Sequence, residues 1–365
     1  MFSKRVLFIT IVFLLIVTSP SLAYQFGGEL NTGVNALFYE NTNQNQNLIY
    51  ENVNLELNFE NANFEISAKN SYGYTDNNYN LDISLKKAYI RHKFKDIRLT
   101  LGKQPVSWSF GSLINTVDYN LGAETLDQET SAKYVNALEL SYPINWYSSL
   151  SLVNEFNPDY DKIGFRARTL VKDYDISLNY VNKEVNNQNN SRLGLSFKGD
   201  IGNVGIYGSV LNLNNNTNNI STNAYMLGSD YSYILDGGYG NRLYFQGEYH
   251  MIENNEGIFE VLNSLGKTVS SSEEQLMKLF NSDYLKIFLG NVSYNINDFS
   301  SIGVFSITSL DDGSTALIPN YSNQLSSNTS LNIKLSYLSG KEDDFLGSGQ
   351  LLPKAVLNVE LSYIF

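Results

Sequence analysis

The sequence predicts an all-β protein, a closed antiparallel β-barrel that spans a membrane. Three observations lead to this prediction: apolar and polar residues alternate along most of the chain after residue 23, the alternating segments are long, and short turns alternate with longer polar loops. Side chains on a strand point to opposite faces with a period of two, so each segment has one apolar and one polar face. A soluble sandwich would alternate as well, and the other two observations favour the membrane barrel.

The first of these two observations is the length of the alternating segments. Between residues 52 and 59, Val53, Leu55 and Leu57 share one face while Asn and Glu residues occupy the other. Many such segments run beyond the ~5–6 residues of a globular strand and match the ~9–11 of a tilted membrane strand. Tyrosines gather near segment ends, as in the aromatic girdles of membrane barrels. They are Tyr72, Tyr74, Tyr142, Tyr147, Tyr174, Tyr180 and Tyr294.

The number of strands follows from parity. The alternation marks seventeen clear segments, whereas single-chain bacterial barrels usually have an even number because both ends lie on the periplasmic side. The stretch 314–322 supplies a further strand, although Pro319 interrupts it and removes a ladder hydrogen bond. We therefore expect eighteen strands, with sixteen as the alternative. Either barrel is wide enough to enclose a water-filled channel.

The first 23 residues read as a secretory signal peptide. Lys4 and Arg5 precede an apolar run from 6 to 17, and Ser21-Leu22-Ala23 places small residues at a cleavage site. An uncleaved anchor is the alternative, but the run is shorter than the ~20 residues of a spanning helix. Residues 24–365 are then a single barrel domain in the outer membrane.

Composition excludes several classes of function. Cysteine is absent, so thiolate metal sites and cysteine nucleophiles are excluded. The chain has two histidines, which are few for an imidazole metal site or a histidine-based catalytic relay. The formal charge of −12 argues against a nucleic-acid partner, which requires a surplus of basic residues. We expect no cofactor and no metal.

The charged residues predict a constriction. The connection 110–131 is one of the longest in the chain, carries acidic residues and no basic ones, and would narrow the lumen if it folded inward. Strand polarity places a group of arginines on the lumen face, with a bulge or face switch near Lys86-Lys87. Opposed acidic and basic walls would orient dipolar solutes and select ions. The acidic residues are Asp118, Glu124, Asp127 and Glu129, and the basic ones are Arg91, Arg98, Arg166 and Arg168.

The block LTLGKQPVSWSFGSLINTVDYN at 99–120 resembles one found in porin-like outer-membrane families, including the alginate-export type and related uncharacterised barrels. The matching residues are Leu101, Gly102, Lys103, Gln104, Trp108, Gly111, Asn115 and Asp118, and Ser109 stands where those families commonly have glycine. The resemblance implies a porin for passive diffusion of small hydrophilic solutes or ions.

The last segment also resembles an outer-membrane signature. Leu357, Val359, Leu361, Tyr363 and Phe365 share one face, and the chain stops at an aromatic residue. The resemblance implies that Tyr363 and Phe365 form the signal recognised by the barrel-assembly machinery. Outer-membrane lipid is the expected environment, and a homotrimer is compatible with the apolar outer wall.

The loop 253–282 shows helical spacing in two places, so we expect two short helices there, as a compact loop or as a lid or plug.

Two other function classes stay open. His250 and Glu248 share the lumen face of one strand, where acid–base chemistry of a barrel enzyme is conceivable. A barrel that uses its outer loops as an adhesin is the other.

Overall fold

The fold is described from a computed structural model of the chain. It describes residues 24–39, 46–59, 61–73, 78–108, 110–120, 122–123, 134–185, 188–215, 220–235, 241–253, 283–341, 344–346 and 353–365. The predicted signal peptide, the acidic residues Glu124, Asp127 and Glu129, and the predicted helices beyond Glu253 lie outside these ranges.

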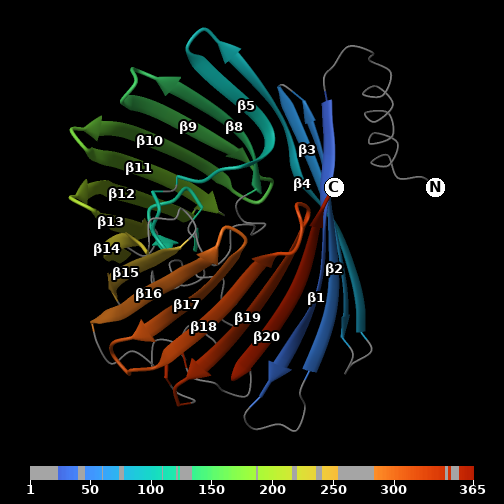
Figure 1. The fold of residues 1–365 in the computed structure, drawn as a ribbon. Coiled ribbons are helices and arrows are strands. Elements are labelled where there is room, and N and C mark those ends of the chain that lie inside the picture. The colour runs from blue at the N-terminus through green and yellow to red at the C-terminus, as the bar shows by residue number, and fades with distance from the viewer. Residues whose placement is uncertain are drawn as a thin grey trace.

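Eighteen antiparallel strands form one closed sheet, as predicted (Figure 1). The barrel strands are β1 (Tyr24–Phe38), β2 (Gln46–Phe59), β3 (Ala62–Gly73), β4 (Asn78–Phe94), β5 (Ile97–Pro105), β8 (Tyr134–Pro143), β9 (Ser148–Phe156), β10 (Asp161–Val171), β11 (Tyr174–Val185), β12 (Gln188–Ile201), β13 (Val204–Asn215), β14 (Ile220–Ile234), β15 (Arg242–Glu253), β16 (Tyr284–Asn297), β17 (Ser300–Ser309), β18 (Thr315–Gln324), β19 (Thr329–Ser339) and β20 (Ala355–Ile364). Two short strands, β6 (Ile114–Asn115) and β7 (Gly122–Ala123), pair only with each other.

Each barrel strand pairs with its neighbours in chain order, and the first strand closes the ring against the last. Leu30 of β1 lies opposite Val53 of β2 on one side and Tyr363 of β20 on the other. The two ends of the barrel therefore differ. One end, here called the short-turn end, carries Tyr24, Phe365 and short turns such as Lys95-Asp96 and Lys172-Asp173. In both turns the first residue has a positive φ, 54° and 57°, as tight hairpins require. The opposite end is called the long-loop end.

The eighteenth strand, which the sequence analysis expected at 314–322, is β18. It pairs with β17 along its length, including Val304 opposite Pro319. On the β19 side the pairing runs from Thr315 to Leu317, stops, and resumes at Asn320 in the same register. Proline has no N–H to donate, so the ladder opens beside it without shifting.

The faces of the strands agree with the alternation in the sequence. Apolar side chains such as Ile83, Leu193 and Leu227 point outward and are exposed, while polar side chains such as Asn54 and Ser67 point inward. Aromatic residues project at the short-turn end between β8 and β9, where Trp146 is 99% exposed and Tyr147 is 65% exposed. Among the described residues no helix has the length and apolarity of a membrane span.

Candidate functional site

The candidate site is built around a segment that leaves the end of β5 and lies inside the barrel (Figure 1, teal). We call residues 106–123 the inner segment; 109 and 121 fall outside the described residues. All eight residues from 112 to 119 are buried. The inward fold that the sequence predicted for this connection is therefore present over its first part, and the structure shows how it is held.

Apolar side chains fix the inner segment to one part of the inner wall. Leu113, Ile114 and Val117 pack against inward residues of β13 to β17, including Leu211 and Leu289. Trp108 and Tyr119 form a second cluster with inward residues of β8, β9 and β11, and their rings meet edge to face at 5.3 Å. Burying apolar side chains on both partners stabilises the inward position.

Sequence reasoning missed this apolar inner wall, although β16 carries a signal for it. Leu285, Ile287 and Leu289 face inward while Phe288 and Val292 face outward, so this part of β16 is apolar inside as well as largely apolar outside, with Lys286 as the exception. A strand that is apolar on both faces is covered on both. In an otherwise polar lumen, such a strand marks where something packs inside.

Two glycines give the inner segment room. A Cβ on Gly164 of β10 would lie 2.6 Å from the Tyr119 ring, and a Cβ on Gly194 of β12 would lie 2.7 Å from Val117 Cγ1. Any other residue at these positions would push the inner segment away from the wall. The sequence shows both glycines within strands, where glycine commonly marks the close approach of another part of the chain.

Polar side chains of the wall bind the backbone of the inner segment. Arg192 donates to the carbonyl of Tyr119 at 2.8 Å, Asn179 to that of Val117 at 3.1 Å, and Gln246 to that of Gly111 at 3.1 Å. Lys162 donates to Asn120 Oδ1 at 2.6 Å. These donors come from four different strands, so the inner segment is held along its length.

Glu248 of β15 is the centre of the attachment. Its side chain is 0% exposed and its carboxylate accepts hydrogen bonds from the backbone N–H groups of Leu113 and Ile114, the latter at 3.4 Å. Tyr207 Oη donates to it at 2.9 Å, and His250 Nε2 lies 2.9 Å away. A buried carboxylate is stable only when its oxygens are hydrogen-bonded in this way.

The motif residues Asn115 and Asp118 shape the inner segment itself. Asp118 is buried and accepts from the backbone N–H of Trp108 at 2.6 Å and from Ser107 Oγ at 2.8 Å. Asn115 donates to the carbonyl of Trp108 at 3.0 Å and accepts from the N–H of Val117 at 3.0 Å. Both side chains fold the segment back on itself, and Asp118 lies under cover rather than against open solvent.

The remaining motif residues have separate structural positions. Gly102 has a φ of +125°, and a Cβ there would lie 2.2 Å from the carbonyl oxygen of Ala88, so glycine is required. Gly111 also has a positive φ, +89°. Gln104 points inward and donates to the carbonyl of Ala137 at 3.2 Å, whereas Lys103 shares the outward face of β5 with Leu101.

The four arginines lie on the inward face. Arg98 alternates with the outward Ile97 and Leu99, and Arg91 lies opposite Thr100. Arg166 donates to Ser177 at 3.0 Å and Arg168 forms an ion pair with Asp175, both across the β10–β11 pair. The bulge expected near Lys86-Lys87 is also present.

That bulge keeps Arg91 inward. Glu65 of β3 pairs with Lys87 and Ile66 with Leu85, which leaves Lys86 extra. Both lysines lie near Glu65, at 3.8 Å for Lys86 and 2.5 Å for Lys87. Because the bulge inserts one residue, the polar side chains of β4 that follow it, including Arg91, face inward.

The described residues hold no group of three or more His, Asp or Glu side chains placed to bind a metal ion. The candidate site is a polar lumen that is partly filled by the attached inner segment, with arginines toward the short-turn end.

Comparisons with known proteins bear on the fold. No family model and no curated protein sequence matches the chain. Among solved structures, OccAB4 of Acinetobacter baumannii has a TM-score of 0.60 at 10% identity, covering 95% of this chain and 100% of that one.

Two further structures agree. OccAB1 of Acinetobacter baumannii has a TM-score of 0.59 at 9% identity, covering 94% of this chain and 96% of that one. A BenF-like porin from Pseudomonas fluorescens Pf-5 has a TM-score of 0.58 at 10% identity, covering 94% and 98%. At this level of identity the likeness establishes the fold: the chain is a closed, porin-like barrel of eighteen antiparallel strands.

Proposed function

We propose that this protein is an outer-membrane porin that lets small hydrophilic solutes or ions diffuse through a water-filled channel. The observation that carries the proposal is the orientation of the side chains. Apolar residues cover the outside of a closed barrel, and most polar and charged ones line its inside. An apolar wall of this extent would be unstable in water and suits lipid, and an inward polar wall suits an aqueous pore. The short-turn end would face the periplasm.

The inner segment would be the constriction of this channel. Its hydrogen bonds to Arg192, Asn179, Gln246 and Glu248 hold it against the wall, where it would narrow the lumen. Glu124, Asp127 and Glu129 follow directly after it and would add acidic groups beside the channel. Arg91, Arg98, Arg166 and Arg168 would form the basic wall, and the two would share control of ion selectivity.

Three further proposals concern the partners of the protein and its relation to other barrel families. The stacked rings of Tyr363 and Phe365, with centroids 6.3 Å apart, would form the signal for the barrel-assembly machinery. The apolar outer wall would allow a homotrimer. The block at 99–120 supports kinship with alginate-export-type barrels, on those residues alone.

An enzymatic function is disfavoured by the position of the one acid–base pair considered. His250 is 2% exposed, and the carboxylate of Glu248 is occupied by donors from the inner segment and from Tyr207. A solute in the lumen would not reach either group, so the pair positions the inner segment. The adhesin alternative rests on outer loops and would be favoured if loop deletions abolished binding while conductance stayed unchanged.

Planar-bilayer recording of the refolded chain from Tyr24 tests the proposal. We expect stable, stepwise channels in KCl and a measurable reversal potential in a salt gradient. A chain that is folded, as judged by heat-modifiable mobility and β-rich circular dichroism, yet forms no channels would contradict it.

A further inference from the structure

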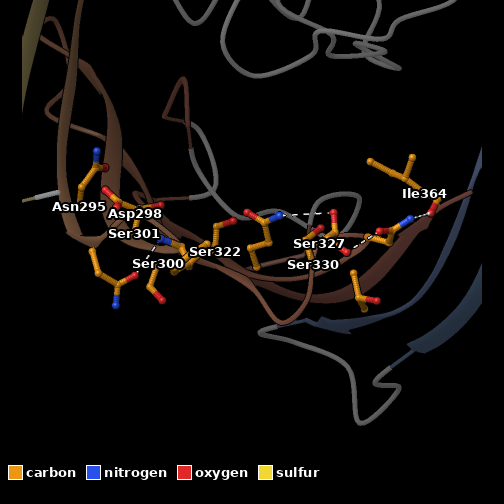
Figure 2. A pocket seen from close by; sticks show the side chains of 13 residues that line it. Asn295, Asp298, Ser300, Ser301, Ser322, Ser327, Ser330 and Ile364 are labelled. Carbon is orange, nitrogen blue, oxygen red and sulfur yellow. Dashed lines mark hydrogen bonds between the residues drawn. The ribbon is translucent and has the colours of Figure 1, made fainter. Parts of the chain in front are cut away.

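A hollow at the short-turn end of the lumen has a lining unlike that of the arginine wall. It measures about 500 Å³, within the ~300–1,000 Å³ of small-molecule sites, and lies beside the short turns that join β16 to β17 and β18 to β19 (Figure 2). Six of its thirteen lining residues are Ser or Thr and four are Asn or Gln. Asp298 is the one charged residue among them, and none of the thirteen is a cation.

The polar groups are arranged in cross-strand rows. Asn295, Ser301 and Ser322 lie directly opposite one another on β16, β17 and β18, on the inward face that Phe305 also occupies. The row continues beyond the hollow through Asn332 to Glu360. Directly opposed residues on one face of a sheet lie about 4.5–5.5 Å apart at Cβ, so one small solute would reach several of these groups at once.

The second row runs in parallel, farther into the barrel. Asn320 lies opposite Lys334, Lys334 opposite Asn358, and Asn358 opposite Asn35 of β1. Asn358 donates to Asn35 Oδ1 at 2.7 Å and to Tyr50 Oη at 2.9 Å. The inner wall from β18 to β1 therefore carries amides on both sides of Lys334, farther into the barrel than the hydroxyl-rich hollow.

The chemistry of this lining matches one class of solute. Hydroxyls and amides both donate and accept hydrogen bonds, and sugar hydroxyls do the same. Within the hollow an anion would meet the carboxylate of Asp298 and no cation, since Arg242, opposite Asn295, and Lys334, opposite Asn320, lie outside the lining. Phe299, which is 61% exposed and also lines the hollow, offers carbon surface for the C–H face of a sugar ring.

We propose that this hollow is a subsite for uncharged, polyhydroxylated solutes of the sugar type, which the channel would conduct preferentially along its amide wall. The proposal rests on the proposed channel function and deepens it by naming a substrate class. Organic anions, which the arginines on the other side of the lumen would attract, are the competing class and are distinguished by the test below.

The test is the inhibition of ion current by a neutral disaccharide, sucrose, compared with gluconate at equal ionic strength. We expect sucrose to reduce the current of the wild-type channel at concentrations where gluconate has little effect. Ser322→Phe should raise the half-inhibiting sucrose concentration roughly 5–10-fold, because it fills the hollow and removes hydrogen-bonding groups.

Ser141→Phe is the matched control. Ser141 lies opposite Arg98 on the other side of the lumen, and, like Ser322, it is two residues from the short-turn end of its strand. The control should change sucrose inhibition less than twofold. Gln324→Met, which removes an amide of the hollow at nearly constant volume, should act like Ser322→Phe and serves if the larger substitution prevents folding.

Equal effects of Ser322→Phe and Ser141→Phe, gluconate inhibition as strong as that by sucrose, or a conducting wild-type channel that sucrose does not inhibit would each overturn the subsite while leaving the channel function intact. A folded wild-type chain without conductance would overturn both.

Discussion

Single residues inside the barrel decide where the inner segment lies. Glu248 and Leu113 are 135 residues apart in the sequence, yet the carboxylate of one accepts the backbone N–H of the other. Five donor groups surround this carboxylate: two backbone N–H groups, Tyr207, Gln246 and His250. A side chain without acceptors at this position would leave several buried donors unpaired, which costs roughly 1–3 kcal/mol for each.

Glu248→Leu should therefore loosen the inner segment. We expect larger current fluctuations and a higher mean conductance in single-channel recordings, because the segment would leave the wall and exchange between positions. Glu56→Leu is the control. It removes the same charge from the lumen, but Glu56 bonds to Asn63 and Lys87 and not to the inner segment. Fluctuations that rise equally in both variants would assign the effect to lost charge instead of lost attachment.

At the scale of elements, the inner segment and the barrel wall fit each other closely. Gly164 and Gly194 are the points of nearest approach, where Tyr119 and Val117 occupy the space of a side chain. Apolar residues of β13 to β17 pack against Leu113, Ile114 and Val117, and valines of β8, β9 and β11 pack beside Trp108. The inner segment therefore behaves as part of the packed interior and not as a free loop.

Gly164→Ala should displace this packing, since the new Cβ would lie 2.6 Å from the Tyr119 ring and 2.8 Å from the Trp108 ring. The chain has two tryptophans, of which Trp146 is 99% and Trp108 3% exposed. In a Trp146→Phe background, Trp108 reports on the inner segment alone. We expect its emission to shift to the red and to become more accessible to acrylamide.

The control for this substitution is Gly247→Ala in the same background. Its Cβ would meet only Phe288, at 3.5 Å, on the outward face. Its emission should match that of the parent. An unchanged Trp108 spectrum in Gly164→Ala would mean that the inner segment does not rest on β10 in solution.

The whole molecule is asymmetric around its axis. The inner segment covers the wall from β8 to β17, and the wall from β18 round to β3 carries amides and paired charges. The exposed Arg91 and Arg98 lie between these parts, near Glu139 of β8. Arg168 is neutralised by Asp175. We therefore expect Arg91 and Arg98 to contribute more to the basic side of the lumen than Arg168 does.

The double variant Arg91→Gln with Arg98→Gln should shift the reversal potential in a KCl gradient toward cations, with a change of roughly twofold or more in the permeability ratio and a smaller change at high salt. Arg168→Gln combined with Asp175→Asn removes one charge of each sign and should leave the ratio nearly unchanged. If both double variants shift the ratio alike, selectivity is set elsewhere in the lumen.

The sequence by itself determined the barrel. Alternation with a period of two is a local property of each segment, so it identified the strands, their inward and outward faces, and the bulge near Lys86. Parity then favoured an eighteenth strand at 314–322 in spite of Pro319, because a closed barrel with both ends on one side needs an even number; sixteen was the other even count. The inward fold of the connection after β5 was also predictable from its length and position.

Only the tertiary structure decided what that connection touches. Leu285, Ile287 and Glu248 face inward by local alternation, but whether they meet water or another part of the chain depends on which strands closure brings opposite residues 106–123. Asp118 has the chemistry of a channel-lining acid, and its hydrogen bonds to Ser107 and Trp108 place it under cover. Contacts between segments more than a hundred residues apart are set by strand register and barrel diameter, which no local pattern contains.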